Sequence, residues 1–179
     1  MELGCRVAVR ADIPRLTAVM DAAIAELQRD FLDERQIASS RAIMGIDTQL
    51  IEDGTYFVVG TPDGDVAGCG GWSRRATLFG SDRSAGRDGS LLDPASEPAK
   101  VRAMYTAPAF ARRGVGRLIL ARCEAAAAAE NFTSVELMAT LSGFQLYTAC
   151  GYEVVERLEH PAGGVVVPLV RMRKILPER

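Results

Sequence analysis

Several features on which common protein chemistries depend are scarce in this chain. No apolar run approaches the ~18 residues that a membrane-spanning helix needs, and the segment 1–6 lacks the basic and then apolar order of a secretory signal. Lys and Arg number 21 against 23 Asp and Glu, which gives a net charge of −2. We therefore expect no membrane span, no secretory signal and no general nucleic-acid-binding surface.

Histidine and paired cysteines are scarce as well. His160 is the only histidine, in a Glu-His-Pro segment that we expect to form a surface turn. Zinc triads and metalloprotease motifs need more than one histidine and are excluded, and a Ser-His-Asp or Cys-His mechanism would have to use His160. The four cysteines are scattered and form no Cys-x-x-Cys motif: Cys5, Cys69, Cys123 and Cys150. We interpret them as reduced core side chains of a cytoplasmic protein that has no metal site.

The rest of the composition is that of an ordinary globular protein. The 179 residues are 48% hydrophobic and 25% charged, with a mean hydropathy of +0.06. Because domains usually hold ~100–200 residues, and neither an internal repeat nor a linker is visible, we predict a single domain over residues 1–179.

The first 54 residues predict a short strand followed by three helices. Alternation over 6–10 predicts a strand, and Asp12 is positioned to cap the helix that follows. One apolar stripe recurs at helical spacing along that helix: Leu16, Val19, Met20, Ala23, Ile24, Leu27 and Phe31. Further helices are predicted over 34–44 and 48–52, the second ended by Gly54.

A hairpin and a long loop follow. Segments 56–59 and 65–73 read as two strands around a Pro-Asp-Gly turn. Three glycines in the second strand predict a bulge or a close backbone neighbour there: Gly68, Gly70 and Gly71. The segment 76–98 is rich in Gly, Ser, Asp and Pro, and loops of this length are either functional lids or disordered. Composition alone leaves both alternatives open.

The second half alternates strands and helices. The predicted elements are a strand over 101–106 stopped by Pro108, a helix from Gly114, a strand over 134–139, a helix over 143–150 closed by Gly151, and strands over 152–159 and 165–174. Pro168 predicts a bulge or an edge position in the last strand, because proline cannot donate a ladder hydrogen bond. The order β-α-α-β-β-β-α-β-α-β-β indicates a mixed α/β fold.

The most informative segment is the strand-to-helix turn before residue 117. The first four N–H groups of a helix lack internal partners, and its dipole places positive charge there, so an anion is favoured. Gly114 and Gly116 let such an anion approach the backbone, and Arg112, Arg113 and Arg117 add positive charge. This pattern predicts a pyrophosphate site. Two familiar phosphate motifs are absent, because Ile119 replaces the third glycine of the dinucleotide fingerprint and no Gly-Lys-Ser/Thr is present.

Two motifs together resemble the GNAT superfamily of N-acetyltransferases. The family's Gln/Arg-x-x-Gly-x-Gly/Ala motif falls on 111–116, with Pro108 six residues before its first glycine. Its second signature, Asn-Ala-x-x-Phe-Tyr-x-x-x-Gly-Phe, falls on 142–152. The chain departs from the pattern in three respects: Ala111 replaces Gln or Arg, Ser142 replaces the frequent Asn, and the segment 76–98 is longer than compact members require.

The resemblance implies a fold and a cofactor. The implied fold is a mixed, mostly antiparallel central sheet flanked by helices, with a parallel, splayed strand pair at the cofactor site. Acetyl-CoA would be the co-substrate, and no metal is implied. Its pantetheine arm would bond the main chain of Met104, Tyr105 and Thr106; we expect the side chains of Met104 and Tyr105 to pack in the core. Its diphosphate would bind the turn formed by Arg112, Arg113, Gly114, Val115, Gly116 and Arg117.

The resemblance also implies a reaction, direct transfer of the acetyl group to a small-molecule or peptide amine. Tyr147 matches the family tyrosine that protonates the departing CoA thiolate, with plain packing beside Phe144 as its alternative. No general base is assigned, because Glu136, Glu97 and Asp93 match no motif position. Homodimers are frequent in the family, but the sequence fixes neither the oligomeric state nor the acceptor.

Alternatives to this enzyme remain open. One is a non-catalytic acyl-CoA-binding or sensing module that keeps the phosphate turn without a reactive acceptor site. Another is a nucleotide- or phosphate-binding protein unrelated to acyl transfer. Trp72, the single tryptophan, could line an acceptor pocket, although core packing is favoured.

Overall fold

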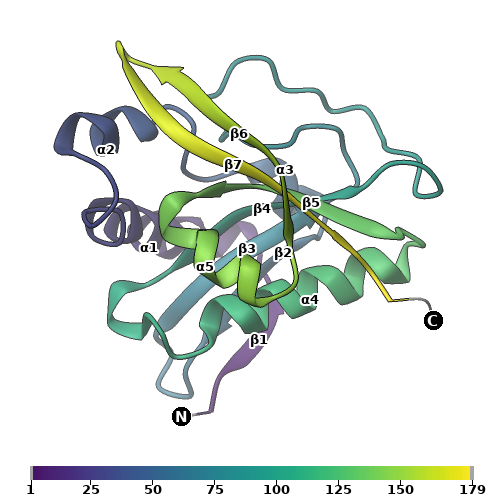
Figure 1. The fold of residues 1–179 in the computed structure, drawn as a ribbon. Helices are drawn as coiled ribbons and strands as arrows, with labels where there is room; N and C mark the ends of the chain where they lie inside the picture. The colour runs from purple at the N-terminus through teal and green to yellow at the C-terminus, as the bar shows by residue number, and fades with distance from the viewer. Residues whose placement is uncertain (1, 178–179) are drawn as a thin grey trace.

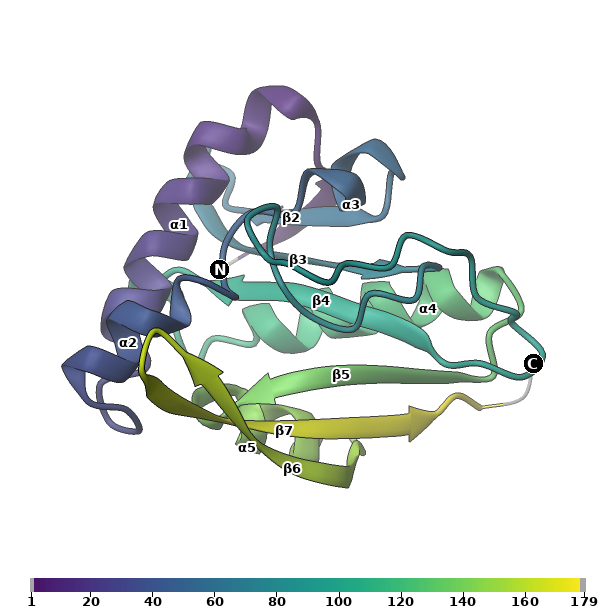
Figure 2. The ribbon, with the colours of Figure 1, turned by 90° about the horizontal axis from the view of Figure 1, so that it is seen from above.

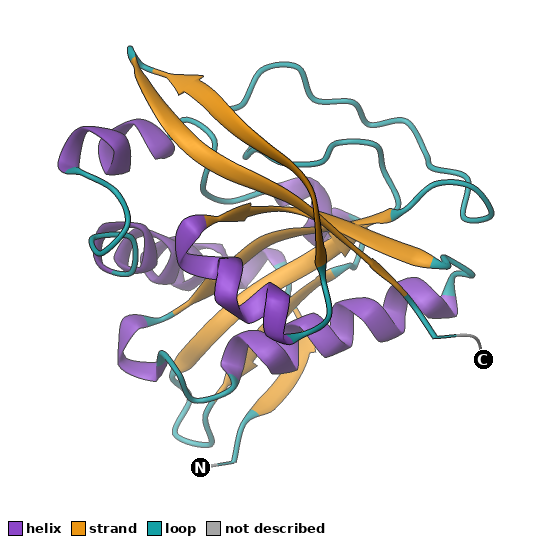
Figure 3. Cartoon of the chain, viewed as in Figure 1, coloured by secondary structure: helices purple, strands orange, loops and turns teal. Residues whose placement is uncertain are grey.

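The computed structural model describes residues 2–177 and contains one seven-stranded sheet (Figures 1 and 3). In spatial order its strands are β1 (Gly4–Val7), β2 (Tyr56–Gly60), β3 (Val66–Ser73), β4 (Ala99–Thr106), β5 (Ser134–Thr140), β7 (Val165–Ile175) and β6 (Glu153–Ala162). Only β4 and β5 are parallel; the other neighbouring pairs are antiparallel. The predicted mixed, mostly antiparallel sheet with one parallel pair is therefore confirmed.

Helices cover both faces of the sheet (Figure 2). They are α1 (Ile13–Glu26), α2 (Glu34–Ser40), α3 (Thr48–Glu52), α4 (Val115–Ala129) and α5 (Leu141–Ala149), with short 3-10 turns η1 (Arg10–Asp12) and η2 (Pro108–Phe110). Helices α4 and α5 pack on one face, and α1 and α3 pack on the other. Because alternate residues of a strand point to opposite sides, β2 contributes to both faces: Val59 packs with α4, and Val58 packs with α1. The sheet thus separates two hydrophobic cores.

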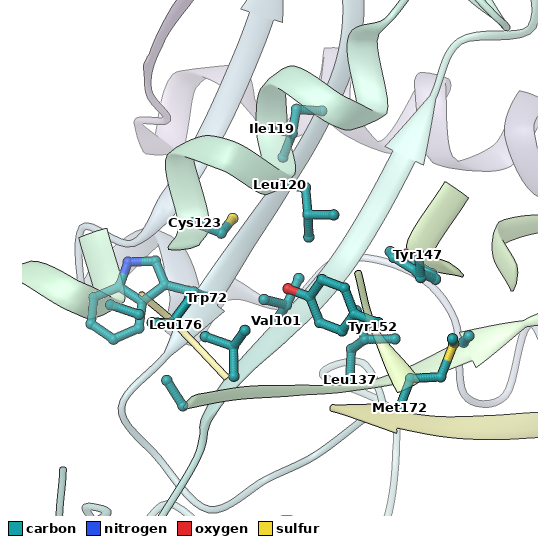
Figure 4. Close-up of a cluster of buried hydrophobic side chains, with 14 of the residues drawn as sticks. Trp72, Val101, Ile119, Leu120, Cys123, Leu137, Tyr147, Tyr152, Met172 and Leu176 are labelled. Carbon is teal, nitrogen blue, oxygen red and sulfur yellow. The ribbon is translucent and has the colours of Figure 1, made fainter. Parts of the chain in front are cut away.

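The larger core lies between the sheet and helices α4 and α5 (Figure 4). Ile119, Leu120 and Cys123 of α4 contribute its fully buried centre. Trp72 is 2% exposed in this core, its ring packed edge-on against Phe132 at 5.9 Å. The expectation that Trp72 packs in the core is confirmed, and it does not line the cavity described below.

The glycines of β3 allow close packing on both faces. A Cβ at Gly68 would lie 2.8 Å from the main-chain carbonyl oxygen of Tyr105 and 2.6 Å from the Val115 side chain, and one at Gly70 would lie 3.2 Å from the Cα atom of Met104. A Cβ at Gly71 would meet the Tyr56 backbone and ring. The prediction of a close backbone neighbour is confirmed at all three positions.

Several predicted details were wrong. Asp12 does not cap α1: its carboxylate accepts a hydrogen bond from the Val9 amide at 2.8 Å and pairs with Arg6, so it stabilises the preceding 3-10 turn instead. His160 lies in β6 opposite Val167 rather than in a surface turn. The second helix ends at Ser40 rather than at residue 44.

Two further predictions concern Phe31, at the outer end of the apolar stripe, and Pro168; the first was wrong and the second is confirmed. Phe31 lies beyond α1 and is exposed, whereas the stripe from Leu16 to Ile24 is buried as expected, except that Val19 is only partly buried. Pro168 pairs with Glu159 of β6, past the last β5–β7 pair at Leu169, so one side of its backbone has no strand neighbour. The predicted edge-like position of Pro168 is confirmed.

The segment 76–98 forms an ordered loop over the sheet face opposite α4 (Figure 2). Arg75, at its start, pairs with Asp53 at 2.7 Å, and Arg87, near its middle, pairs with the fully buried Asp47 at 2.8 Å. Main-chain hydrogen bonds join Ala76 to Ser90 and Thr77 to Asp88. These contacts fix the loop against the α1–α3 region.

Candidate active site

The parallel strands β4 and β5 separate soon after they meet. They pair only at Ala99–Val135 and Lys100–Glu136, whereas β4 continues along β3 to Thr106 and β5 continues along β7 to Thr140. Beyond these residues β4 and β5 have no pairing with each other, and Figure 2 shows them separating; we call the space between the diverging halves the wedge. Unpaired strand edges favour a ligand that supplies the missing hydrogen bonds.

A β-bulge in β4 lies at this wedge. Arg102 pairs with Gly71 and Tyr105 with Cys69, so two residues of β4, Ala103 and Met104, oppose a single residue of β3. Ala103 has a φ of +51°, which is rare for a residue with a Cβ. The Tyr56 hydroxyl donates a 2.7 Å hydrogen bond to the Ala103 carbonyl and so holds the bulge in place.

A cavity fills the wedge and has walls from both faces of the sheet. From the α4 side, Tyr147 and Leu137 contribute; from the loop side, Phe79 and Met138 contribute; Met104 and the bulge lie between them. The cavity can therefore be reached from the α4 side of the sheet and from the side of the 76–98 loop, and two molecules that enter from opposite sides could meet in it.

The glycine turn forms the α4 end of the wedge. Gly114 precedes α4 with a φ of +84°, in open space, and Arg112 has a φ of +63°. Arg112, Arg113 and Arg117 are exposed, with the Arg113 guanidinium 5.9 Å from the Phe110 ring. Exposed cations around unpaired helix N–H groups are the arrangement that a diphosphate needs.

Gly116 has a different surrounding from the one predicted. A Cβ at this position would lie 2.7 Å from a methyl group of Leu146, so the glycine allows α5 to pack against the first turn of α4. Its neighbour Val115 is buried and packs in the α4 core. The turn thus joins the open, exposed Gly114 to two residues that pack inward.

Tyr147 lies on α5 at the cavity wall, 8% exposed, with its ring edge-on to Tyr152 at 5.9 Å. Burial raises the pKa of the Tyr147 phenol above its ordinary value. The phenol therefore keeps its proton at neutral pH and can donate a hydrogen bond into the cavity.

Glu136 marks the vertex where the wedge begins. Its fully buried carboxylate contacts Lys100 at 2.9 Å and also Arg171, with Arg173 at 3.6 Å. Burial alone would raise the pKa of Glu136, but hydrogen bonds from Arg171 and Lys100 outweigh it and leave that pKa lowered. Glu136 is thus an ion-paired carboxylate that fastens β4, β5 and β7 together, and it does not line the cavity.

The other two carboxylates considered from the sequence are also outside the cavity. Asp93 accepts hydrogen bonds from the Ala95 amide and the Ser96 hydroxyl, and Glu97 accepts one from the Asp93 amide. They stabilise a turn of the 76–98 loop. Across the residues that the structure describes, no carboxylate lines the wedge cavity.

Sequence reasoning missed Arg102 and Ala103. The bulge leaves no signature in hydrophobic periodicity; the one available signal was Gly70, the residue that lies opposite it. Lys100 and Arg102 alternate with apolar residues, a pattern typical of a strand with one solvent-facing side, yet both cations are buried, which is exceptional. Burial lowers the pKa of the Arg102 guanidinium, and the nearby Asp47 opposes that shift.

Residues 2–177 hold neither a membrane-spanning helix nor a cluster of metal ligands. No helix in this range is long and apolar enough to cross a membrane. No group of three or more His, Cys, Asp or Glu side chains in it is arranged to hold a metal ion. All four cysteines are free thiols.

Comparison with known proteins agrees with the two motifs. The acetyltransferase (GNAT) family model matches residues 20–152, more than half of the chain, so the protein belongs to the GNAT acetyltransferase family. The resemblance stated from the sequence is confirmed. No curated protein sequence matches the chain significantly.

Solved structures share the whole fold. A GCN5-related N-acetyltransferase from Rhodopseudomonas palustris has a TM-score of 0.71 at 18% identity and covers 98% of this chain and 97% of its own. PaiA N-acetyltransferase from Thermoplasma acidophilum, in complex with coenzyme A, has a TM-score of 0.66 at 13% identity, covering 98% and 99%. The protein yncA from Salmonella typhimurium, with its cofactor acetyl-CoA, has a TM-score of 0.66 at 16% identity, covering 100% and 96%. At these identities the likeness shows the fold.

Proposed function

We propose that the protein is a single-domain N-acetyltransferase that moves an acetyl group from acetyl-CoA directly to an amine. The observation that carries this proposal is that β4 and β5 part after two paired residues, beside a cavity walled by Tyr147, and that the glycine turn at Gly114 leads from β4 into α4. Family membership and the coenzyme A found in structures of the same fold support it.

Each end of the cofactor has a place along this path. The diphosphate binds the turn at residues 112–117, where exposed arginines surround the start of α4. The pantetheine arm lies in the wedge and bonds the free main-chain groups of Met104, Tyr105 and Thr106. The side chain of Tyr105 is packed away, its hydroxyl accepting a 2.8 Å hydrogen bond from the Gly45 amide. These assignments place the thioester near the β4 bulge.

In the proposed reaction the neutral amine attacks the thioester carbonyl, the C–N bond forms, and the C–S bond breaks with its electron pair to release the CoA thiolate, while the nitrogen loses one proton to water. A lysine-type amine with a pKa near 10.4 must first lose a proton, at a cost of about 4.6 kcal/mol at pH 7. The departing thiolate needs stabilisation, which the Tyr147 phenol supplies. Because the thiol is more acidic than the phenol, and burial raises the pKa of Tyr147 further, Tyr147 acts mainly as a hydrogen-bond donor to the developing charge.

The test is release of CoA thiol with a panel of amines, together with the Tyr147→Phe variant. This variant removes only the hydroxyl, so we expect kcat to fall about 100-fold while the Kd for CoA stays within a factor of two of the original. Calorimetry with CoA measures the second quantity. An unchanged kcat in Tyr147→Phe would remove Tyr147 from the mechanism.

One observation favours the alternative of a non-catalytic acyl-CoA-binding or sensing module. In the part of the chain that the structure describes, the cavity wall holds no carboxylate or histidine that could accept the amine proton. Such a module would bind acetyl-CoA through the same turn and wedge, but would release no CoA with any amine. Tight binding of acetyl-CoA without release of CoA for any amine of the panel would support this alternative.

A further inference from the structure

Among residues 2–177, one charged side chain lines the wedge cavity, and it is a cation. Arg102 precedes the β4 bulge and is 5% exposed. Its neighbour Val101 points into the α4 core, so by strand alternation Arg102 points to the opposite face, where the loop 76–98 lies. Arg102 therefore stands on the side from which a second substrate reaches the thioester.

The guanidinium is held by one of its nitrogens only. Nη2 donates to the Gly80 carbonyl at 2.9 Å and lies 2.7 Å from Asp47. Nε is buried and has no hydrogen-bond partner. A buried donor without a partner is costly, so a ligand group that accepts from it gains that free energy.

The surroundings leave this cation incompletely neutralised. Asp47 is fully buried, but it is shared between Arg102 and Arg87. A further carboxylate, Asp82, stands 3.9 Å from Arg87 and is partly exposed, where water and salt screen it. Two guanidiniums thus share one buried carboxylate, and an anion can complete the cluster.

The neighbouring cavity continues the path outward and adds mixed charges. It shares Leu78 and Phe79 with the wedge cavity and is lined further out by Arg83, Asp88 and His160. Asp88 is exposed and already accepts a hydrogen bond from the Ser90 amide. This entrance offers no cluster of carboxylates to attract a polycation such as a polyamine.

We propose, resting on the proposed function, that the acceptor carries a carboxylate next to its amine, and that Arg102 binds this carboxylate. An α-amino acid has this chemistry: its amine would lie at the thioester by the bulge while its carboxylate accepts from the adjacent Arg102. Apolar residues form the facing wall, among them Leu78, Phe79, Met138 and Leu169, which suits an apolar side chain.

The experiment compares acceptors that differ only at the carboxylate. CoA release is measured with L-leucine and L-phenylalanine against their carboxamides, and with spermidine. We expect kcat/KM to be about 100-fold higher for the free acids, because a buried polar group built to pair a substrate group rejects an analogue that lacks it. The less basic amine of a carboxamide is easier to deprotonate, so intrinsic reactivity works against this result.

Two variants assign the preference to Arg102. Arg102→Gln should lower kcat/KM for the free acids to the level of the carboxamides, with little change for the carboxamides and in the Kd for CoA. Arg74→Gln is the matched control: it removes a partly buried guanidinium that pairs with Glu130 and lies neither in the cavity wall nor beside Asp47, so the acid preference should persist. Binding of CoA by each variant verifies folding, and the comparison in the original protein stands even if a variant does not fold.

The outcomes separate the two proposals. Carboxamides or spermidine used as well as the free acids would overturn the carboxylate site and leave the acetyltransferase proposal intact. The same holds if Arg102→Gln folds and keeps the acid preference. No CoA release with any acceptor would overturn the proposed function and this inference with it.

Discussion

Gly114 has a backbone conformation that few residues adopt and no neighbour within 4 Å of the place of a Cβ. Asn and Asp tolerate a positive φ better than other residues and have nearly the same shape. A pair of substitutions at this position therefore separates charge from strain, which a larger acidic residue would not do.

We expect Gly114→Asp to weaken CoA binding by about tenfold relative to Gly114→Asn, because a carboxylate at the start of α4 repels the diphosphate. The difference should shrink at high salt, since the turn is exposed. Calorimetric titration with CoA at two ionic strengths measures both effects. Equal Kd values for the two variants would place the diphosphate elsewhere.

Three residues of the candidate site show what could and what could not be predicted from the sequence. The glycine pattern predicted a turn with bare backbone at Gly114, and the structure has one there. The same pattern assigned Gly116 to the phosphate, whereas its missing Cβ faces Leu146, because spacing along a chain does not show which side of a helix a neighbour covers. Arg102 was missed for the same reason: its environment is made by Asp47 and Gly80, which are distant in sequence.

At the scale of elements, α5 depends on the first turn of α4. A Cβ at Gly116 would meet the Leu146 side chain at 2.7 Å, and that side chain can be shortened in turn. We expect Gly116→Ala to destabilise the protein by about 1–3 kcal/mol through overpacking. Adding Leu146→Ala should then cost less than it does in the original chain, so the two changes couple favourably.

Denaturant unfolding of both single variants and the double variant measures this coupling. Since α5 carries Tyr147, Gly116→Ala should also lower kcat more than it raises the Kd for CoA. Strictly additive free energies of unfolding would contradict the contact. The matched control is Gly89→Ala, at an exposed position where a Cβ would have no neighbour within 4 Å.

Periodicity located most elements because one face of each is buried. Helix α3 lies where it was predicted, and α4 begins one residue after Gly114. The errors fall where a tertiary contact overrides a local signal: Asp12 pairs with Arg6 instead of capping α1, and β6 continues through His160 because β7 supplies a partner strand. The β4 bulge depends on Gly70 and Tyr56 across the sheet, which no local pattern reveals.

At the scale of the whole molecule, a cluster of buried ion pairs joins the central strands at the point where β4 and β5 begin to diverge. Strands β4, β5 and β7 meet at Glu136, which is buried beneath Lys100 and Arg171, and beyond it β4 and β5 diverge to form the wedge. Strand order could not be predicted from the chain alone, since β7 lies between β5 and β6. The mixed sheet with its splayed strand pair was predicted from the family resemblance alone. The ion pairs of Glu136 with Lys100 and Arg171 explain how the diverging strands stay joined at one end.

This cluster predicts how stability depends on pH. The folded pKa of Glu136 is lowered, so its contribution to stability is present above the ordinary carboxyl pKa of about 4.3 and is lost as the pH falls through the lower folded value. Hydrogen bonds from Arg6 to Asp12 and from Arg75 to Asp53 lower those pKa values too, with the same sign. The free energy of unfolding should therefore fall steeply below about pH 4.5.

Glu136→Gln should remove Glu136's share of that fall. At pH 7 we expect it to destabilise the protein by about 3 kcal/mol, because it leaves Lys100 and Arg171 without their buried partner. Below about pH 4 the difference from the original protein should narrow, because the carboxylate of the unfolded chain then takes up a proton while the folded one stays charged down to its lowered pKa. Urea unfolding between pH 3 and pH 7 measures both, with the exposed Glu159→Gln as control. A constant difference at every pH would mean that Glu136 acts through packing alone, and the wedge would then need another explanation for its fixed vertex.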